Sequence, residues 1–151
     1  MVSTHIEVNK IIQAPIDDCF NWFYYSDNFV KSLMVFVCKP QFKGKYGIGS
    51  RRIVLTVAGL FKEEIVSVKK QQEIHYKVYQ SFPKVIQDNN IIYFQAISSK
   101  ETQINWSIEL SVKAGCLSEF LTKVGGKLAS ELYDSILNAS QKELRLASKK
   151  F

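Results

Sequence analysis

Glu63 and Tyr76 are the two residues whose chemistry the sequence brings together most directly. Glu63 lies between Phe61 and Ile65 in the alternating pattern of one expected strand, and Tyr76 follows Ile74 in that of the next. Both side chains are therefore predicted to point inward. A carboxylate beside a phenol could orient the polar end of a ligand, or move protons during a cyclisation or dehydration if desolvation raised its pKa. The alternative interpretation is an exposed Glu63 that faces a lysine.

Other reaction chemistries find little support in the residue pattern. His5 and His75 are the only histidines and stand in separate expected strands, so a nucleophile with a histidine base is disfavoured. Cys19, Cys38 and Cys116 are far apart and lack the close spacing of zinc ligands or a redox pair. We interpret the cysteines as reduced and structural, and we expect no metal and no cofactor.

The composition indicates one ordered domain over residues 1–151. The chain is 46% hydrophobic and 13% aromatic, which is enough for a core at this length. Its formal charge of +6 comes from lysines and arginines scattered along the chain, which is typical of a solvated surface. No apolar run is long enough for a membrane-spanning helix or resembles a signal peptide, so a cytoplasmic location is expected.

The periodicity predicts an α+β fold in which most elements are strands. A strand over 4–12 leads into a short helix that begins near Pro15, and a second short helix is expected over 27–35, before turns in 39–49. The later strands are expected at 51–58, 61–68, 73–81, 90–98 and 102–112. Their short links require antiparallel neighbours.

A long amphipathic helix is expected after Gly115. The Gly125-Gly126 pair leaves two interpretations of its start, because each glycine costs about 1 kcal/mol relative to alanine inside a helix. Either the pair lies within a kinked helix, or the regular helix begins nearer Lys127.

Several short motifs, weak singly, occur in an order that resembles a known superfamily. They are Ala14-Pro15-Ile16, Phe20-Asn21-Trp22-Phe23, Gly47-Ile48-Gly49, Arg51-Arg52, Glu63-Glu64-Ile65, Ile74-His75-Tyr76, Pro83 and Thr102-Gln103-Ile104-Asn105-Trp106. The chain resembles the START-like superfamily, also called Bet v 1-like or SRPBCC, and within it the polyketide cyclase/dehydrase and lipid transport branch. The resemblance implies a helix-grip fold, with a curved antiparallel sheet of about six or seven strands wrapped around the C-terminal helix.

The resemblance also implies an apolar cavity between sheet and helix. On this basis the candidate ligand contacts are Leu55, Glu63, Tyr76, Tyr93, Trp106, Ile108, Phe120, Val124, Leu128 and Tyr133. Tyr93 and Phe94 lie on opposite faces of their strand, and either face could line the cavity. Plain core packing is an equal interpretation for Trp106 and Tyr133.

Three functional hypotheses follow. We favour a non-catalytic carrier or sensor of a hydrophobic small molecule, such as a lipid, a sterol-like compound, an aromatic or a polyketide. The first alternative is a polyketide cyclase or dehydratase that uses Glu63 and Tyr76. The second is a protein-interaction module, whose sign would be an exposed apolar patch on the outer sheet or the last helix. We expect no nucleic-acid partner, no stable membrane insertion, and a monomer or weak homodimer.

Overall fold

The computed structural model describes residues 2–41, 46–112 and 118–148. The elements in chain order are β1 (Val2–Ile12), α1 (Ile16–Tyr24), the 3-10 helix η1 (Ser26–Lys31), β2 (Val35–Pro40), β3 (Arg51–Thr56), β4 (Gly59–Lys69), β5 (Glu73–Phe82), β6 (Gln87–Ser98), β7 (Glu101–Val112) and α2 (Ser118–Ser148). Within these residues no helix is both long enough and apolar enough to cross a membrane.

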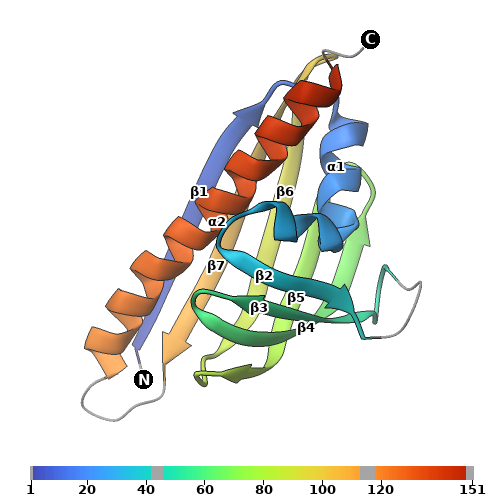
Figure 1. The fold of residues 1–151 in the computed structure, drawn as a ribbon. Coiled ribbons are helices and arrows are strands. Elements are labelled where there is room, and N and C mark those ends of the chain that lie inside the picture. Colours follow the sequence, from blue (N-terminus) through green and yellow to red (C-terminus); the bar gives the residue numbers. More distant parts are fainter. Residues whose placement is uncertain (1, 42–45, 113–117, 149–151) are drawn as a thin grey trace.

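The strands form one antiparallel sheet in the order β1-β7-β6-β5-β4-β3-β2. The sheet curves around α2, and α1 and η1 lie beside the C-terminal half of that helix (Figure 1). This is the expected helix-grip architecture. Strand β7 shows the predicted alternation most clearly, since Ile104, Trp106, Ile108 and Leu110 are all buried toward the helix.

The segment after α1 differs from the sequence-based expectation. The second helix is a short 3-10 turn that ends at Lys31, and Val35–Pro40 is the edge strand β2 rather than a helix end followed by turns. Ser32 makes the break, because its Oγ accepts a hydrogen bond from the Met34 N–H and turns the chain. Val35 then pairs with Thr56 of β3, and a register shift between Val35 and Val37 obscures the period-two pattern.

The two adjacent glycines lie inside α2, which is helical from Ser118 to Ser148. The interpretation that placed the regular helix start near Lys127 is therefore wrong. A Cβ atom on Gly126 would lie 3.1 Å from Thr4 Cγ2 of β1, and one on Gly125 would lie 3.5 Å from Leu110 Cδ2 of β7. The glycines thus allow α2 to lie close against the first and last strands.

Candidate functional site

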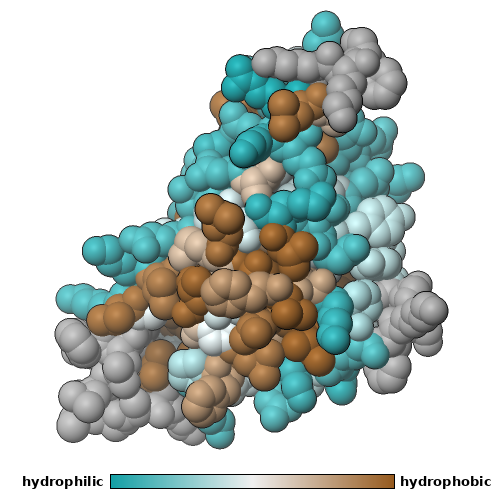
Figure 2. Space-filling view, viewed as in Figure 1, coloured by the Kyte–Doolittle hydropathy of each residue, from teal (hydrophilic) through white to brown (hydrophobic). Residues whose placement is uncertain are grey.

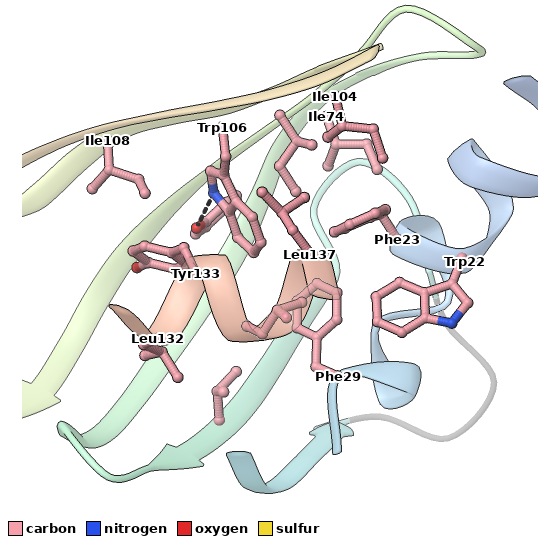
Figure 3. Close-up of a cluster of buried hydrophobic side chains, with 14 of the residues drawn as sticks. Trp22, Phe23, Phe29, Ile74, Ile104, Trp106, Ile108, Leu132, Tyr133 and Leu137 are labelled. Carbon is pink, nitrogen blue, oxygen red and sulfur yellow. Dashed lines mark hydrogen bonds between the residues drawn. The ribbon is translucent and has the colours of Figure 1, made fainter. Parts of the chain in front are cut away.

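Aromatic and aliphatic side chains fill the space between the sheet and α2 (Figure 3). The Trp106 indole Nε1–H donates a hydrogen bond of 3.0 Å to Tyr76 Oη, and the Tyr133 ring from α2 lies 4.5 Å from the Trp106 ring. Tyr133 Oη in turn donates to Gln87 Oε1 at 3.4 Å. Phe29 from η1 also contacts the Trp106 ring. Three of the rings in this interior therefore carry polar atoms that hydrogen-bond within it.

A buried ion pair lies in the same interior. Arg52 and Glu63 are directly opposite in the register of β3 and β4, and Arg52 Nε donates to Glu63 Oε1 at 2.7 Å. Their side chains are only 7% and 9% exposed. The Arg52 guanidinium lies 5.0 Å from the centre of the Tyr76 ring and 5.2 Å from that of Phe29. Among the described residues, Arg52 Nη2 is buried without a hydrogen-bond partner.

Strand alternation explains why an arginine is buried here. Arg52, Val54 and Thr56 share the inward face of β3, and Glu63 lies between the inward residues Phe61 and Ile65 of β4. Arg52 is not among the site residues predicted from the sequence, although its position two residues before Val54 was the available signal. The alternative of an exposed Glu63 is wrong, because its partner is this buried arginine.

Burial controls the ionisation of the interior phenols. It raises the pKa of Tyr76 well above its ordinary value, with the neighbouring Tyr133 and the Glu63 carboxylate adding to the effect. The pKa of Tyr133 is raised for the same main reason and by Glu63. Burial is the largest influence on Arg52 and lowers its pKa, but the Glu63 carboxylate together with Cys38 and Tyr76 raises it by more, so the net pKa of Arg52 is raised. The interior therefore holds neutral phenols beside a charged guanidinium.

The remaining empty space in this interior is small. A cavity of about 20 Å³ lies between the sheet, η1 and α2, where Glu63, Tyr76, Trp106 and Tyr133 line it. A second cavity of about 10 Å³ near Tyr46 and Gly47 is lined by Arg52. Each has room for about one water molecule. Among the described residues, neither of these two cavities reaches the expected size of a ligand, because large side chains fill the space around them.

The predicted ligand contacts divide into buried and exposed groups. Glu63, Tyr76, Trp106, Ile108 and Tyr133 are buried. Leu128 is half-buried. In contrast, Leu55, Tyr93 and Val124 are 38%, 40% and 51% exposed, so the structure does not bring them to the interior.

Strand faces explain two of these differences. Tyr93 is on the outer face of β6, where it pairs with Glu73 and Asn105, and Phe94 is the inward residue. Leu55 alternates with the inward Val54 and Thr56. The side chain of Phe120 lies outside the described residues.

An exposed apolar patch lies on the outside of the molecule. Figure 2 shows hydrophobic residues gathered across the middle of the face that carries η1 and β2. We call Leu33, Phe36, Leu55 and Val57 the β2 patch, and Leu33 is 94% exposed within it. The turn that presents Leu33 is fixed by hydrogen bonds from Val57 N–H to Met34 O and between Ser32 Oγ and Ser135 Oγ. The apolar surface is therefore held in a defined shape.

Solved structures with the same architecture share little sequence with this chain. The Zhui aromatase/cyclase from a Streptomyces species superposes with a TM-score of 0.80 at 12% identity, over 95% of this chain and 94% of that one. A START superfamily protein from Mycobacterium smegmatis gives 0.76 at 10%, over 95% and 98%. The chain has the START-like, or Bet v 1-like, fold.

Other members of this fold extend the comparison to plants. Norcoclaurine synthase from Thalictrum gives a TM-score of 0.73 at 16% identity, over 97% of both chains. No protein-family model and no curated protein matches the sequence. At these identities the likeness establishes the START-like fold and leaves the function to the residues of this chain.

Proposed function

We propose that the protein binds a hydrophobic small molecule between the sheet and α2, with an oxygen of the ligand accepting a hydrogen bond from Arg52. The ligand would have an apolar or aromatic body and a carbonyl or carboxylate head. The observation that carries this proposal is the buried Arg52–Glu63 pair, in which one guanidinium nitrogen has no partner among the described residues.

Energetics support a functional rather than a stabilising role for this pair. Replacing a buried ion pair by apolar residues of similar volume is often neutral or stabilising by about 1–4 kcal/mol. An unsatisfied buried donor costs about a further 1–3 kcal/mol. A ligand oxygen would satisfy the free Arg52 nitrogen, and the surrounding rings of Phe29, Tyr76 and Trp106 would contact an apolar ligand body.

Binding requires that the filled interior opens. A partly buried hydrogen bond of 2.6 Å between Ser32 and Ser135 and an exposed ion pair of 2.6 Å between Lys31 and Glu143 join the η1 segment to α2. Glu143 also accepts a hydrogen bond from the Trp22 indole. Exposed ion pairs contribute only about 0–1 kcal/mol each. Movement of η1 away from α2 would break these interactions and withdraw Phe29 from the core, and this movement is the proposed route for a ligand.

The experiment compares ligands that differ in the oxygen. The probes are 1-naphthoate, 1-acetonaphthone and decanoate, with naphthalene as the analogue that lacks an acceptor, measured by thermal shift and native mass spectrometry. The wild type should gain thermal stability with the oxygen-bearing probes. The double variant Arg52→Leu/Glu63→Leu should lose this gain, and the exposed-pair variant Arg51→Leu/Glu64→Leu should keep it. Absence of any bound probe in the wild type, or equal binding of naphthalene, would contradict the proposal.

The cyclase or dehydratase alternative has weaker support. Glu63 is held by Arg52, and Tyr76 already accepts the Trp106 hydrogen bond while its raised pKa keeps the phenol protonated. Neither group is therefore free to act as a base in this arrangement. Among the described residues, no histidine lines either of the two interior cavities that Arg52 and Glu63 border.

The β2 patch favours a second candidate function, a protein-interaction module whose partner is a second copy of this chain. Monomeric proteins seldom expose contiguous apolar surface of this kind. The patch residues are uncharged, so no like charges oppose each other when two copies meet through this surface about a two-fold axis. β2 is also the last strand of the sheet, so the patch lies at an open sheet edge.

Sedimentation velocity over a range of protein concentrations tests this second candidate. The wild type should show a concentration-dependent dimer, and Leu33→Asp should be monomeric. Ile97→Asp is the control, because Ile97 is 49% exposed on β6, away from the patch. A wild type that stays monomeric at every concentration would exclude self-association through the β2 patch.

A further inference from the structure

A polar groove of about 450 Å³ lies on the outside of the molecule between β1 and the C-terminal half of α2. The two elements run side by side in Figure 1. The residues that line the groove are Lys10, Asn138, Gln141, Lys142, Arg145 and Leu146. None of them lines the interior cavities, so the groove is separate from the proposed ligand site.

The lining of the groove is strongly basic. Lys10 comes from β1, and Lys142 and Arg145 come from α2, so positive charge stands on both walls. In the part of the chain that the structure describes, no aspartate or glutamate lines the groove. The nearest acid along the helix stripe is Asp134, which accepts a hydrogen bond from the Asn138 amide at 3.5 Å. Like charges in one groove repel, and a bound anion would remove that repulsion.

The polar residues of α2 that line the groove lie on one side of the helix. Gln141 and Lys142 follow Asn138 by three and four residues, and Arg145 follows them by four and three, so the four residues form one stripe along α2. The Oε1 atom of Gln141 is buried without a partner among the described residues. The two ends of an amide have nearly the same shape, so the Gln141 amide fits equally well when rotated by 180°. In that orientation its NH₂ group takes the place of the oxygen and can donate to an anion. The groove then combines the Asn138 and Gln141 amides with the ammonium groups of Lys10 and Lys142.

Helix electrostatics alone do not account for this arrangement. Cations near the end of a helix favourably complement its dipole, which explains Arg145 without any ligand. That explanation does not extend to Lys10, which belongs to the facing strand. Lys10 of β1 lines the same groove as the basic residues of α2, and this placement of positive charge on both walls points to an anion between them.

We propose that this groove binds the phosphate group of a phosphorylated ligand. A phosphate carries up to two negative charges and several acceptor oxygens, which match several N–H donors from two directions. The phosphate can belong to a soluble compound or to a phospholipid headgroup, and both present the same chemistry. The proposal is independent of the interior site, so each can fail without the other.

The test uses the full chain at constant ionic strength. Inorganic phosphate and pyrophosphate are titrated by calorimetry and by NMR, and phosphatidylcholine vesicles with or without phosphatidate are used in sedimentation. Lys10→Gln and Lys142→Gln should each weaken binding about tenfold, the value of one charge-assisted hydrogen bond. Lys39→Gln on β2 and Lys100→Gln at the β6–β7 turn are the matched controls and should change binding less than about twofold.

The outcomes separate the possible sources of phosphate. Binding of pyrophosphate that depends on Lys10 and Lys142 supports a soluble ligand, and binding only to phosphatidate vesicles with the same dependence supports a lipid headgroup. Equal losses in the groove and control variants would overturn the proposal, because the attraction would then come from net charge alone. Absence of binding to every probe would overturn it as well.

Discussion

Arg52 and Glu63 show how two charges come to lie in a ring-lined interior. Each occupies an inward position of its strand, and the β3–β4 register places them face to face. Each ion needs the other, because an unpaired charge in such a place is far more costly than the pair. The adjacent Arg51–Glu64 pair in the same two strands lies on the outer face and is partly exposed. The two pairs therefore form an internal comparison of buried and solvated charges.

A double-mutant cycle should reveal this dependence. Arg52→Leu alone leaves Glu63 unpaired and should lower the free energy of unfolding by about 3–5 kcal/mol, whereas Arg52→Leu/Glu63→Leu should recover most of that loss. Urea unfolding of the two single variants and the double variant measures both quantities. Arg51→Leu is the exposed control and should have a much smaller effect. A double variant as unstable as the single one would show that the pair itself holds the strands together.

The Tyr133 phenol should make the free energy of unfolding fall as the pH rises above 10. Its folded pKa is raised above the ordinary value of 10.0, so both states hold the proton below pH 10. Above pH 10 the unfolded chain loses the proton first, unfolding then releases a proton, and stability falls as pH rises. Removing the phenol in Tyr133→Phe should reduce this fall by up to about 1.4 kcal/mol per pH unit.

Urea midpoints between pH 8 and pH 11 measure the Tyr133 effect. Cys19 and Cys38 add to the wild-type slope, because burial raises the pKa of these thiols to about 11 and about 12. The comparison is therefore made between slopes of the two proteins and not between absolute stabilities. Identical slopes in wild type and Tyr133→Phe would mean that the Tyr133 phenol is not buried in solution.

At the scale of elements, α2 depends on its contact with β1 and β7. The Gly125-Gly126 pair weakens the helix locally but allows the approach of Thr4, Ile6 and Leu110 side chains. The two glycines differ in the room around them, since the Cβ position of Gly125 has ordinary contacts and that of Gly126 is crowded. Their substitutions should therefore have different effects.

Gly125→Ala should raise the free energy of unfolding by about 0.5–1 kcal/mol through helix propensity. Gly126→Ala gains the same propensity but places its Cβ 3.1 Å from Thr4 Cγ2, so its net effect should be smaller or destabilising. Urea unfolding of both variants tests the difference. Gly126→Ala combined with Thr4→Ser, which removes the crowding methyl group, is the control and should restore the gain. Equal effects of the two single substitutions would show that β1 is not packed closely on the helix.

At the scale of the whole molecule, the interior is a filled core that the proposed function requires to open. Phe29 belongs to η1 and lines the cavity of about 20 Å³ beside Tyr76 and Trp106. Truncation of the Phe29 side chain should therefore enlarge that cavity. A ligand-sized space made there would lie beside the Arg52 guanidinium.

Phe29→Ala should lower the free energy of unfolding by about 3–5 kcal/mol and should bind small ring compounds in the new space. Thermal shift with naphthalene measures the binding. Phe94→Ala is the matched control, since Phe94 is equally a core residue but does not line this cavity. Equal naphthalene binding by both variants would contradict a specific site between η1 and α2.

The sequence by itself determined the START-like fold, the inward faces of β4, β5 and β7, and the places of Glu63, Tyr76 and Trp106. The inward strand faces follow from local periodicity, which a chain expresses before any tertiary contact forms. The START-like fold was predicted from the order of motifs that resembles the superfamily. Periodicity failed at β2, where an edge position and a register shift remove the alternation. It also left the faces of Tyr93 and Phe94 undecided, because both are apolar.

Tertiary structure alone decided how much space remains between the sheet and α2, which residue pairs with Glu63, and which cations line the groove between β1 and α2. Volume depends on how side chains from α2, η1 and the sheet interdigitate, and no periodicity specifies that. Arg52 faces Glu63 through strand register, and Lys10 and Lys142 line one groove because α2 docks on β1. Contacts between residues far apart in the chain arise only when the elements pack, and this molecule's candidate chemistry resides in those contacts.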